Sequence, residues 1–251
     1  MCQLLGICSN REVDIQFSFR EWRHRGRKNP HGYGFAYWQA GELTIVKAAS
    51  SLFAEDQAEM QDVTGARSRV FVAHVRLASV GAQDGANTHP FEASALDRSF
   101  AFAHNGTVAA VKARPLQRQP EGKTDSEHAF LLLLHGLAET PEVHFAARLK
   151  ELADEIRDLG RFNFLMSDGS TLWAYADNSL HFIERQPPYG GELVEFVDDG
   201  YSLGLAEVKR VDERAVLVCT QPLTRELGWR RMNPGELLIV RDGAVQARIG
   251  E

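Results

Sequence analysis

The stretch Met1-Cys2-Gln3-Leu4-Leu5-Gly6-Ile7-Cys8 at the start of the chain contains the features that decide how the chain folds. Its apolar part, from Leu4 to Cys8, is typical of a buried β-strand. Directly before this strand stands Cys2, a position at which a cysteine is unusual. Removal of Met1, which a small second residue permits, leaves a thiol and a free α-amine on the same residue. We therefore expect the mature chain to begin at Cys2.

Cys2 is the candidate nucleophile of this sequence. An α-amine has an ordinary pKa of about 8, so part of it is neutral near pH 7 and accepts a proton. Such an amine activates its own thiol without a separate histidine base. The alternative interpretation is an inert cysteine near a frayed terminus. Cys8 and Cys219 lie in apolar runs, where cysteine behaves as a small buried hydrophobic residue.

The composition is that of an ordinary folded protein. The 251 residues are 44% hydrophobic and 25% charged, which suffices for a sizeable core and excludes wholesale disorder. The net charge of −6 argues against a nucleic-acid partner, and the basic segment Arg20–Lys28 is interpreted as a solvated helix end and loop. Three cysteines without a CxxC motif predict neither a disulfide framework nor a structural zinc site.

The chain also lacks a segment that would direct it to a membrane. The longest uninterrupted apolar run, 129–134, is far shorter than the roughly 20 residues that cross a bilayer. No secretory signal is visible, because Arg11 and Glu12 interrupt the apolar region near the start. We expect a cytoplasmic protein without a membrane partner.

The order of helical and strand patterns predicts an α+β fold. Helices are expected at 12–25, 126–137 and 141–159. Strands are expected at 4–8, 32–38, 43–48, 70–75, 100–103, 162–167, 171–176, 180–183, 202–206, 215–220 and 236–240. The two clear helices occupy the middle of the chain and strands occupy both ends, which favours packed sheets and helices over a doubly wound parallel sheet. Without a linker or an internal repeat, residues 1–251 are expected to form one domain.

The sequence His104-Asn105-Gly106 follows the predicted strand at 100–103. Acyl transfer needs hydrogen-bond donors aimed at the oxyanion of a tetrahedral intermediate. The side-chain amide of Asn105 and the backbone N–H of Gly106 can supply two such donors, because glycine lets the backbone turn without a Cβ in the way. The alternative is a simple Asn-Gly tight turn.

Arg76 and Asp125 have the opposite charges that suit the two ends of an α-amino acid. Arg76 ends the strand at 70–75, and an arginine there can hold a carboxylate with two parallel hydrogen bonds. Asp125 stands at a helix start and can accept hydrogen bonds from an ammonium group. The alternatives are a structural salt bridge and a helix N-cap. His89, in a segment of loop composition at 87–91, is a candidate for a substrate contact or for fixing the loop.

The order of these motifs resembles the class II glutamine amidotransferases, in particular their stand-alone YafJ-type members. The resemblance rests on Cys2, HVRLAS at 74–79, NTHPF at 87–91, AHNG at 103–106 and TDSE at 124–127. It extends through FSF at 17–19, FNFLMSDG at 162–169 and CTQPLT at 219–224, and so covers nearly the whole chain. One departure is the segment 30–35, PHGYGF, which is shorter than in relatives and lacks their aspartate.

The resemblance implies a four-layer αββα N-terminal-nucleophile hydrolase sandwich and a role for each site residue. Cys2 is implied as nucleophile and base, with Asn105 and Gly106 as the oxyanion hole. Arg76 is implied to hold the α-carboxylate of glutamine and Asp125 its α-amine. The residues implied to line the rest of the pocket are Ser79, Thr88 and His89.

The implied reaction releases ammonia from glutamine, or from a related γ-glutamyl amide, through a γ-glutamyl thioester on Cys2. No metal and no organic cofactor are required. The glutaminase-like part fills the chain, so the acceptor of ammonia is either water or a separate synthase polypeptide. A γ-glutamyl-conjugate hydrolase with a different leaving group remains an alternative within the same chemistry.

Two other classes of protein compete with this interpretation. A metal-dependent hydrolase would use His74, His89, His104 and His128 together with Asp125, although the sequence has neither an HExxH nor an HxH pair. A catalytically silent regulatory or partner subunit of the same fold is the second competitor. Covalent labelling of Cys2 by a glutamine-like electrophile distinguishes the hydrolase from both.

Overall fold

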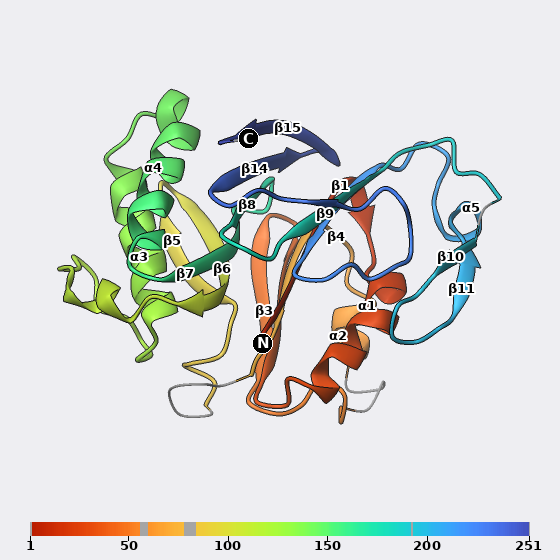
Figure 1. Cartoon of the computed structure of the whole chain (residues 1–251), viewed down its shortest axis with the longest axis horizontal. Coiled ribbons are helices and arrows are strands. Elements are labelled where there is room, and N and C mark those ends of the chain that lie inside the picture. The colour runs from red at the N-terminus through yellow and green to blue at the C-terminus, as the bar shows by residue number, and fades with distance from the viewer. Residues whose placement is uncertain (1, 56–59, 78–83, 192, 251) are drawn as a thin grey trace.

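The computed structural model describes residues 2–55, 60–77, 84–191 and 193–250 (Figure 1). Its larger sheet has seven strands in the order β13-β9-β12-β1-β4-β2-β3, and all the neighbouring strands pair antiparallel. The strands of this sheet are β1 (Gln3–Val13), β2 (Tyr33–Gln39), β3 (Glu42–Ala48), β4 (Ser68–Val75), β9 (His181–Arg185), β12 (Ala215–Cys219) and β13 (Arg230–Arg231). The strand at the start of the chain therefore lies in the middle of the larger sheet.

The second sheet has six strands in the order β15-β14-β8-β7-β6-β5, again antiparallel throughout. Its strands are β5 (Phe91–Ala95), β6 (Arg98–Thr107), β7 (Arg161–Ser167), β8 (Thr171–Ala176), β14 (Glu236–Arg241) and β15 (Ala244–Ile249). A separate two-stranded ribbon joins β10 (Leu193–Glu195) to β11 (Ser202–Gly204). The turn at Asp242-Gly243 has positive φ at both residues, as a two-residue hairpin connection requires.

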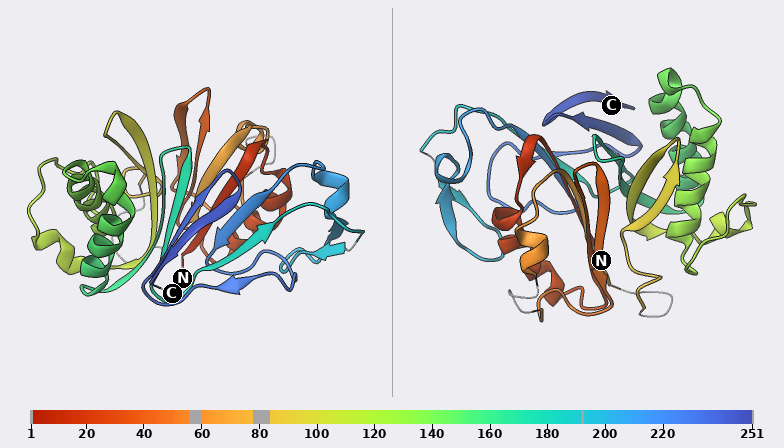
Figure 2. Two further views of the ribbon diagram at one scale, coloured as in Figure 1. Left: turned by 90° about the horizontal axis from the view of Figure 1, so that it is seen from above. Right: turned by 180° about the vertical axis from the view of Figure 1, so that it is seen from behind.

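Helices cover the outer faces of both sheets. The helices α3 (Asp125–Ala138) and α4 (Phe145–Arg157) pack on the six-stranded sheet, with the short helices η2 (Ala109–Ala113) and η3 (Glu142–His144) beside them. The seven-stranded sheet is covered by α1 (Gln16–Trp22), η1 (Arg23–Arg27) and α2 (Gln61–Thr64), while α5 (Leu205–Val208) follows β11. Figure 2 shows α3 and α4 on one outer side of the stacked sheets. The arrangement is the four-layer αββα sandwich that the sequence predicted, in a single domain.

Three hydrophobic cores hold these layers together, and β1 contributes to two of them. Leu5 and Ile7 point to the helix-covered side of the larger sheet, whereas Leu4 and Cys8 point to the smaller sheet. Gly6 stands between them on the inter-sheet face, and a Cβ there would lie 2.9 Å from a methyl carbon of Leu172. The alternation expected for a strand therefore places a glycine on the face that packs against Leu172 of the other sheet.

Several boundaries differ from the sequence-based prediction. The predicted helix at 12–25 begins only at Gln16, because β1 continues to Val13 and pairs with β4 there. The predicted strand at 202–206 is a three-residue strand followed by α5. The predicted helix from Pro141 begins as η3 and becomes α-helical at Phe145. The segment around Phe91, interpreted as loop, starts a strand that pairs with β6.

The basic segment after α1 is only partly the solvated helix end that the sequence suggested. Arg25 is buried, and its guanidinium forms ion pairs with Glu21 and Asp198. The same side chain donates hydrogen bonds to Gln221 Oε1 and to the carbonyl oxygen of Pro222. Except for Glu21, these partners lie far away in the sequence, so a local pattern does not reveal them. Among the described residues, none of the helices combines the length and apolar character that a bilayer crossing requires.

Candidate active site

Cys2 directly precedes β1 and contacts β6 of the other sheet through its carbonyl oxygen. Its Sγ is 3.2 Å from the backbone nitrogen of Leu77, which donates to the sulfur, and 3.5 Å from the carbonyl oxygen of Leu77. The following strand is anchored on its other side, because Leu4 N–H donates to Thr220 Oγ1 at 2.9 Å. Contacts from the residues that follow β4 and β12 therefore fix the start of β1 and the thiol.

The surroundings of the Cys2 thiol act on its pKa in both directions. Burial raises the pKa of the Cys2 thiol above its ordinary value, while the Leu77 N–H and the charge of Arg76 lower it. Cys8 and Cys219 are fully buried in the cores, and burial raises the pKa of Cys8 to about 11 and that of Cys219 further. Cys2 is the cysteine of the three that has a cationic side chain and a backbone donor beside a cavity.

Asn105 and Gly106 lie in β6 of the other sheet, opposite Asn163 and Phe162 of β7. The Asn-Gly pair is thus part of a ladder, and the tight-turn alternative is wrong. Asn105 Nδ2 donates to the carbonyl oxygen of Cys2 at 2.7 Å, which joins the two sheets at Cys2. A carboxamide has two N–H donors, so this contact uses one of them. Asn105 is not among the residues that line the cavity beside Cys2. A Cβ on Gly106 would lie 1.9 Å from the carbonyl oxygen of Arg161, so the close approach of β7 requires a glycine here.

Arg76 follows β4 directly and is buried. Its backbone N–H donates to the carbonyl oxygen of Gly32 at 2.7 Å, and its carbonyl accepts from His31 N–H at 3.0 Å. The short segment before β2, where the sequence departs from its relatives, is therefore attached to the backbone of Arg76. This contact positions the guanidinium beside Cys2.

Asp125 is the first residue of α3. The N-cap of this helix is Thr124, whose hydroxyl accepts from the Glu127 N–H at 3.1 Å, so the N-cap alternative for Asp125 is wrong. Asp125 Oδ2 accepts a hydrogen bond from the Val108 N–H at 2.6 Å. The carboxylate therefore has one oxygen fixed by the backbone after β6 and faces the cavity that contains Cys2.

One cavity of about 120 Å³ brings most of the predicted site residues together. A volume of this order accommodates one small organic group. The predicted residues that line it are Cys2, Arg76, His89, Gly106 and Asp125. Thr88 does not line this cavity, because its hydroxyl donates to the carbonyl oxygen of Asp84 at 2.7 Å. Ser79 lies outside the described residues.

Three buried histidines, His74, His89 and His104, also line the cavity. The ring centroids of His74 and His89 are 4.3 Å apart, and those of His89 and His104 are 6.5 Å apart. Burial lowers the pKa of His74 to about 3 and that of His89 well below its ordinary value, and the neighbouring imidazoles add to this effect. These side chains are therefore neutral imidazoles near pH 7.

The histidines do not assemble the metal site of the competing interpretation. His104 Nδ1 is 2.8 Å from Ser126 Oγ and its Nε2 is 3.1 Å from the carbonyl oxygen of Arg161, so both nitrogens are engaged. His128 Nε2 is 2.9 Å from the Arg114 carbonyl oxygen. Within the described parts of the chain, no three His, Cys, Asp or Glu side chains are grouped as metal ligands.

Two supporting residues were not recognised from the sequence as part of the site. Asn163 is fully buried and donates to the carbonyl oxygen of Asn105 at 3.0 Å, and its Oδ1 accepts from the backbone at Asp177 and Asn178. Leu77 contributes only backbone atoms to Cys2. The FN pair at 162–163 was a usable signal for Asn163, whereas a backbone contact has no sequence signal.

The fold and this cavity define a class of protein, and comparison with known proteins identifies the family. The family model described as class II glutamine amidotransferases matches residues 1–251. The chain belongs to this family. Glutamine amidotransferases use glutamine as substrate, so membership supports hydrolysis of the glutamine amide as the general activity.

Individual relatives agree with this assignment over nearly the whole chain. An uncharacterized protein of Methanocaldococcus jannaschii is 38% identical over 97% of this chain and 70% of its own length. The Escherichia coli K12 protein named "Putative glutamine amidotransferase YafJ" is 34% identical over 94% of this chain and 96% of its own length. The crystal structure of a predicted glutamine amidotransferase from Pseudomonas aeruginosa PA01 matches with a TM-score of 0.75 and 27% identity. The match covers 98% of this chain and 100% of that chain.

Proposed function

We propose that this protein hydrolyses the side-chain amide of glutamine through a covalent γ-glutamyl thioester on Cys2. The observation that carries the proposal is the contact between the Asn105 side chain and the Cys2 carbonyl, at 2.7 Å, beside a cavity that Cys2 lines together with Arg76 and Asp125. This contact joins the nucleophile of one sheet to the oxyanion donors of the other. The full domain, residues 1–251 without Met1, is required because both sheets contribute.

In the first half-reaction, the α-amine of Cys2 takes the proton of its thiol, and the thiolate attacks the amide carbon of glutamine. The resulting oxyanion is stabilised by the second N–H of Asn105 Nδ2 and by the Gly106 N–H. When the C–N bond breaks, the α-amine gives its proton to the leaving nitrogen, and ammonia departs. The thioester on Cys2 remains.

In the second half-reaction, water attacks the thioester while the same α-amine removes one of its protons. Collapse of the second tetrahedral intermediate breaks the C–S bond, and the thiol of Cys2 is restored as glutamate leaves. Each half-reaction returns the amine to its neutral form, so no other acid or base is needed. The neutral state of His74 and His89 fits this division of roles.

Recognition of the substrate uses the two opposite charges that flank the thiol. Arg76 holds the α-carboxylate, and its position directly after β4 places it next to the Leu77 contact of Cys2. Asp125 accepts from the α-ammonium with the oxygen that the Val108 N–H does not occupy. His89 packs along the cavity wall against the substrate. Water, or a synthase on another polypeptide, receives the ammonia.

A mass measurement tests this proposal. The native protein is incubated with a diazo-ketone analogue of glutamine, and its intact mass and N-terminal peptide are determined. We expect one adduct on Cys2 and no Met1 in the labelled chains, with Cys8 and Cys219 unmodified. Labelling of chains that retain Met1, or an adduct on another cysteine, contradicts the self-activating mechanism. The absence of any adduct, together with no release of ammonia from glutamine, indicates a silent subunit.

A further inference from the structure

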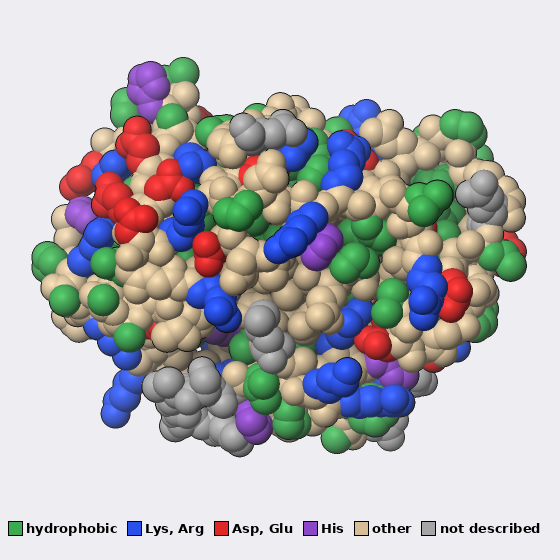
Figure 3. All heavy atoms as spheres, in the orientation of Figure 1, with side chains coloured by type: hydrophobic (Ala, Val, Ile, Leu, Met, Phe, Trp, Pro, Cys, Tyr) green, Lys and Arg blue, Asp and Glu red, His purple; other side chains and the backbone are tan. Residues whose placement is uncertain are grey.

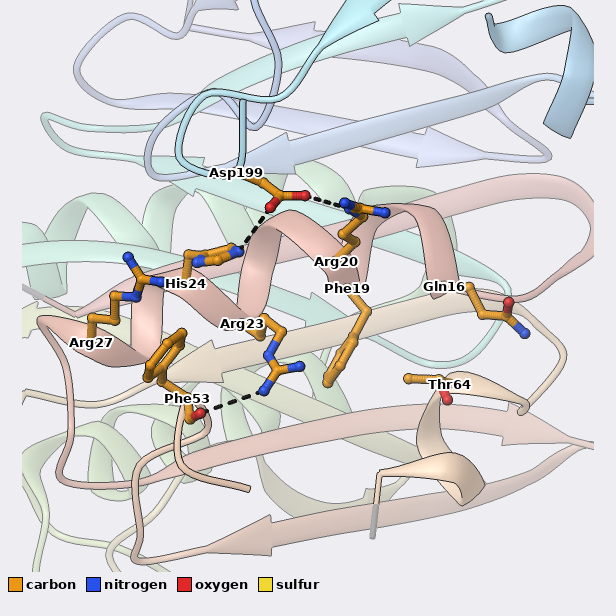
Figure 4. Close-up of a pocket in the computed structure, with 9 residues that line it drawn as sticks. All are labelled: Gln16, Phe19, Arg20, Arg23, His24, Arg27, Phe53, Thr64 and Asp199. Atoms are coloured by element: carbon orange, nitrogen blue, oxygen red, sulfur yellow. Dashed lines mark hydrogen bonds and ion pairs between the residues drawn. The ribbon is translucent and has the colours of Figure 1, made fainter. Parts of the chain in front are cut away.

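A second hollow, which we call the basic groove, lies on the outer surface of α1 and η1 and has a volume of about 740 Å³ (Figure 4). Arg20, Arg23 and Arg27 extend into it from one side of this helical segment, while Phe53 and Thr64 lie across from them. No described residue lines both the basic groove and the cavity of Cys2. The groove is therefore separate from the candidate active site.

The charges in the basic groove are not balanced. Arg20 forms an ion pair with Asp199 and lies 3.8 Å from the centre of the Tyr201 ring. Arg23 and Arg27 have no carboxylate within 4.0 Å among the described residues. Their guanidinium carbons lie 5.8 and 4.2 Å from the centre of the Phe53 ring. Among the described residues, two guanidinium groups of the groove thus have no carboxylate partner, and the third is paired with Asp199.

Figure 3 shows where positively and negatively charged side chains gather on one face of the molecule. Lys and Arg side chains gather over the region of α1, whereas Asp and Glu side chains gather over α4 on the opposite side of the view. The chain as a whole has a net charge of −6. A concentrated positive site on a negatively charged protein favours a compact anion and disfavours long polyanions such as nucleic acid.

Polar atoms at the base of the groove also lack partners. Arg23 Nε and His24 Nδ1 are buried and have no hydrogen-bond partner in the part of the chain that the structure describes. His24 Nε2 is 3.5 Å from Asp199 Oδ1. A buried polar atom without a partner destabilises the folded chain.

We propose that the basic groove binds a small molecule that carries a chain of two or more phosphate groups. Guanidinium groups recognise phosphate by paired hydrogen bonds, and phosphate oxygens only accept, which matches a lining made mostly of donors. The volume falls within the range of sites that enclose one small molecule. Arg23 and Arg27 bind the phosphates, and Arg20, held by Asp199, fixes the end of the chain nearest to Tyr201.

The test is a calorimetric titration of the full-length protein with ATP, ADP, inorganic tripolyphosphate and citrate, without divalent metal and at physiological salt. We expect saturable binding of the phosphate compounds at one site and at least tenfold weaker binding of citrate. Arg23→Gln and Arg27→Gln each remove a charge-assisted contact, so each should weaken binding about tenfold. The matched control Arg148→Gln, on α4 where Arg148 pairs with Glu151, should stay within about twofold of the native protein.

Each outcome decides the proposal. Equal affinity for ATP and tripolyphosphate supports recognition of the phosphate chain alone, and much tighter binding of ATP supports a nucleotide. No saturable binding of any phosphate compound overturns the proposal, as does citrate binding as tightly as tripolyphosphate. Binding that neither arginine variant weakens also overturns it. Thermal melting checks that the variants fold, and the exposed Arg27 keeps one test available if Arg23→Gln unfolds. Because the readout is binding, failure here leaves the glutaminase proposal intact.

Discussion

The cavity of Cys2 and the basic groove differ in how far their charged and titratable side chains are buried. The cavity is about 120 Å³ and is lined by three buried histidines, by Asp125 and by the cationic residues Arg76, Lys112 and Lys123. The groove is about 740 Å³, faces solvent and has three arginines against one aspartate. Burial suppresses charge in the first, because an ionised imidazole there loses its hydration. The open groove keeps its charges hydrated. The difference teaches that this fold keeps the buried cavity, where we propose hydrolysis, apart from an open basic surface, where we propose anion binding.

The largest expected effect is that of removing the Cys2 thiol, and activity without this thiol would contradict the role proposed for the cavity. Cys2→Ala removes the atom that forms the thioester, so we expect ammonia release from glutamine to fall below detection. The buried Cys8→Ser and Cys219→Ser variants serve as controls and should keep most of the activity if they remain folded. Comparable losses in a folded Cys8 or Cys219 variant would mean that the wrong thiol has been assigned.

Asn105→Ala tests whether the cavity stabilises a charge that exists only during reaction. Loss of one oxyanion donor lowers kcat by about 10²–10³-fold in studied enzymes, with little change in KM. Steady-state ammonia release measures both constants. Asn10→Ala is the matched control, because Asn10 bonds to the backbone at Asp212 on the far surface. A fall in kcat/KM that comes entirely from KM would assign Asn105 to ground-state binding.

Arg76→Lys and Asp125→Ala test the paired charges of the cavity. Each should raise KM for glutamine by about 10-fold or more and change kcat less, because these side chains bind the non-reacting end of the substrate. Glutarate monoamide, which lacks the α-amine, should be turned over equally by the native protein and by Asp125→Ala. If Asp125→Ala lowers turnover of both substrates equally, Asp125 has a structural role through its contact with the Val108 N–H.

The smallest expected effect concerns pH and folding stability. The pKa of His74, about 3, and that of His89 lie below the unfolded value of about 6.5, so the unfolded chain binds more protons as pH falls below 6.5. The free energy of unfolding should therefore decrease as pH falls from 6.5 toward 3, by up to about 1.4 kcal/mol per pH unit for each histidine.

Urea denaturation at several pH values between 7 and 5 measures this slope. His89→Gln should make the decline shallower, whereas His144→Gln, at an exposed position on η3, should leave it unchanged. A native protein whose stability is flat between pH 6.5 and 5 would show that the cavity accepts charged imidazoles. The contrast with the basic groove would then lose its physical basis.

Much of the fold and of the site follows from local pattern. The strand of Leu4 to Cys8, the helix α3 and the turn at Asp242-Gly243 have signals that lie within a few residues. Cys2 and Asn105 could be named as candidates from residue type and position near a strand end, and their roles stay predictions. The predicted fold and family are confirmed.

Long-range contacts account for what the sequence did not reveal. Arg25 looked solvated because its partner Asp198 stands 173 residues away in the chain. Thr88 was predicted to line the pocket, but its hydroxyl donates a hydrogen bond to the carbonyl oxygen of Asp84. Asn163 supports Asn105 across a strand pair, which requires the register of β6 and β7 to be known. Such contacts depend on pairing between distant segments, and no local periodicity encodes them.

The central position of β1 has a consequence for how the protein loses activity. Amide hydrogens in a strand with neighbours on both sides and cores on both faces exchange with solvent only when the whole molecule unfolds. The ribbon of β10 and β11, which has only one pairing, should exchange long before β1 does. Because Cys2 is joined to the slowest-exchanging strand, heat inactivation should coincide with global unfolding, even after the ribbon has opened.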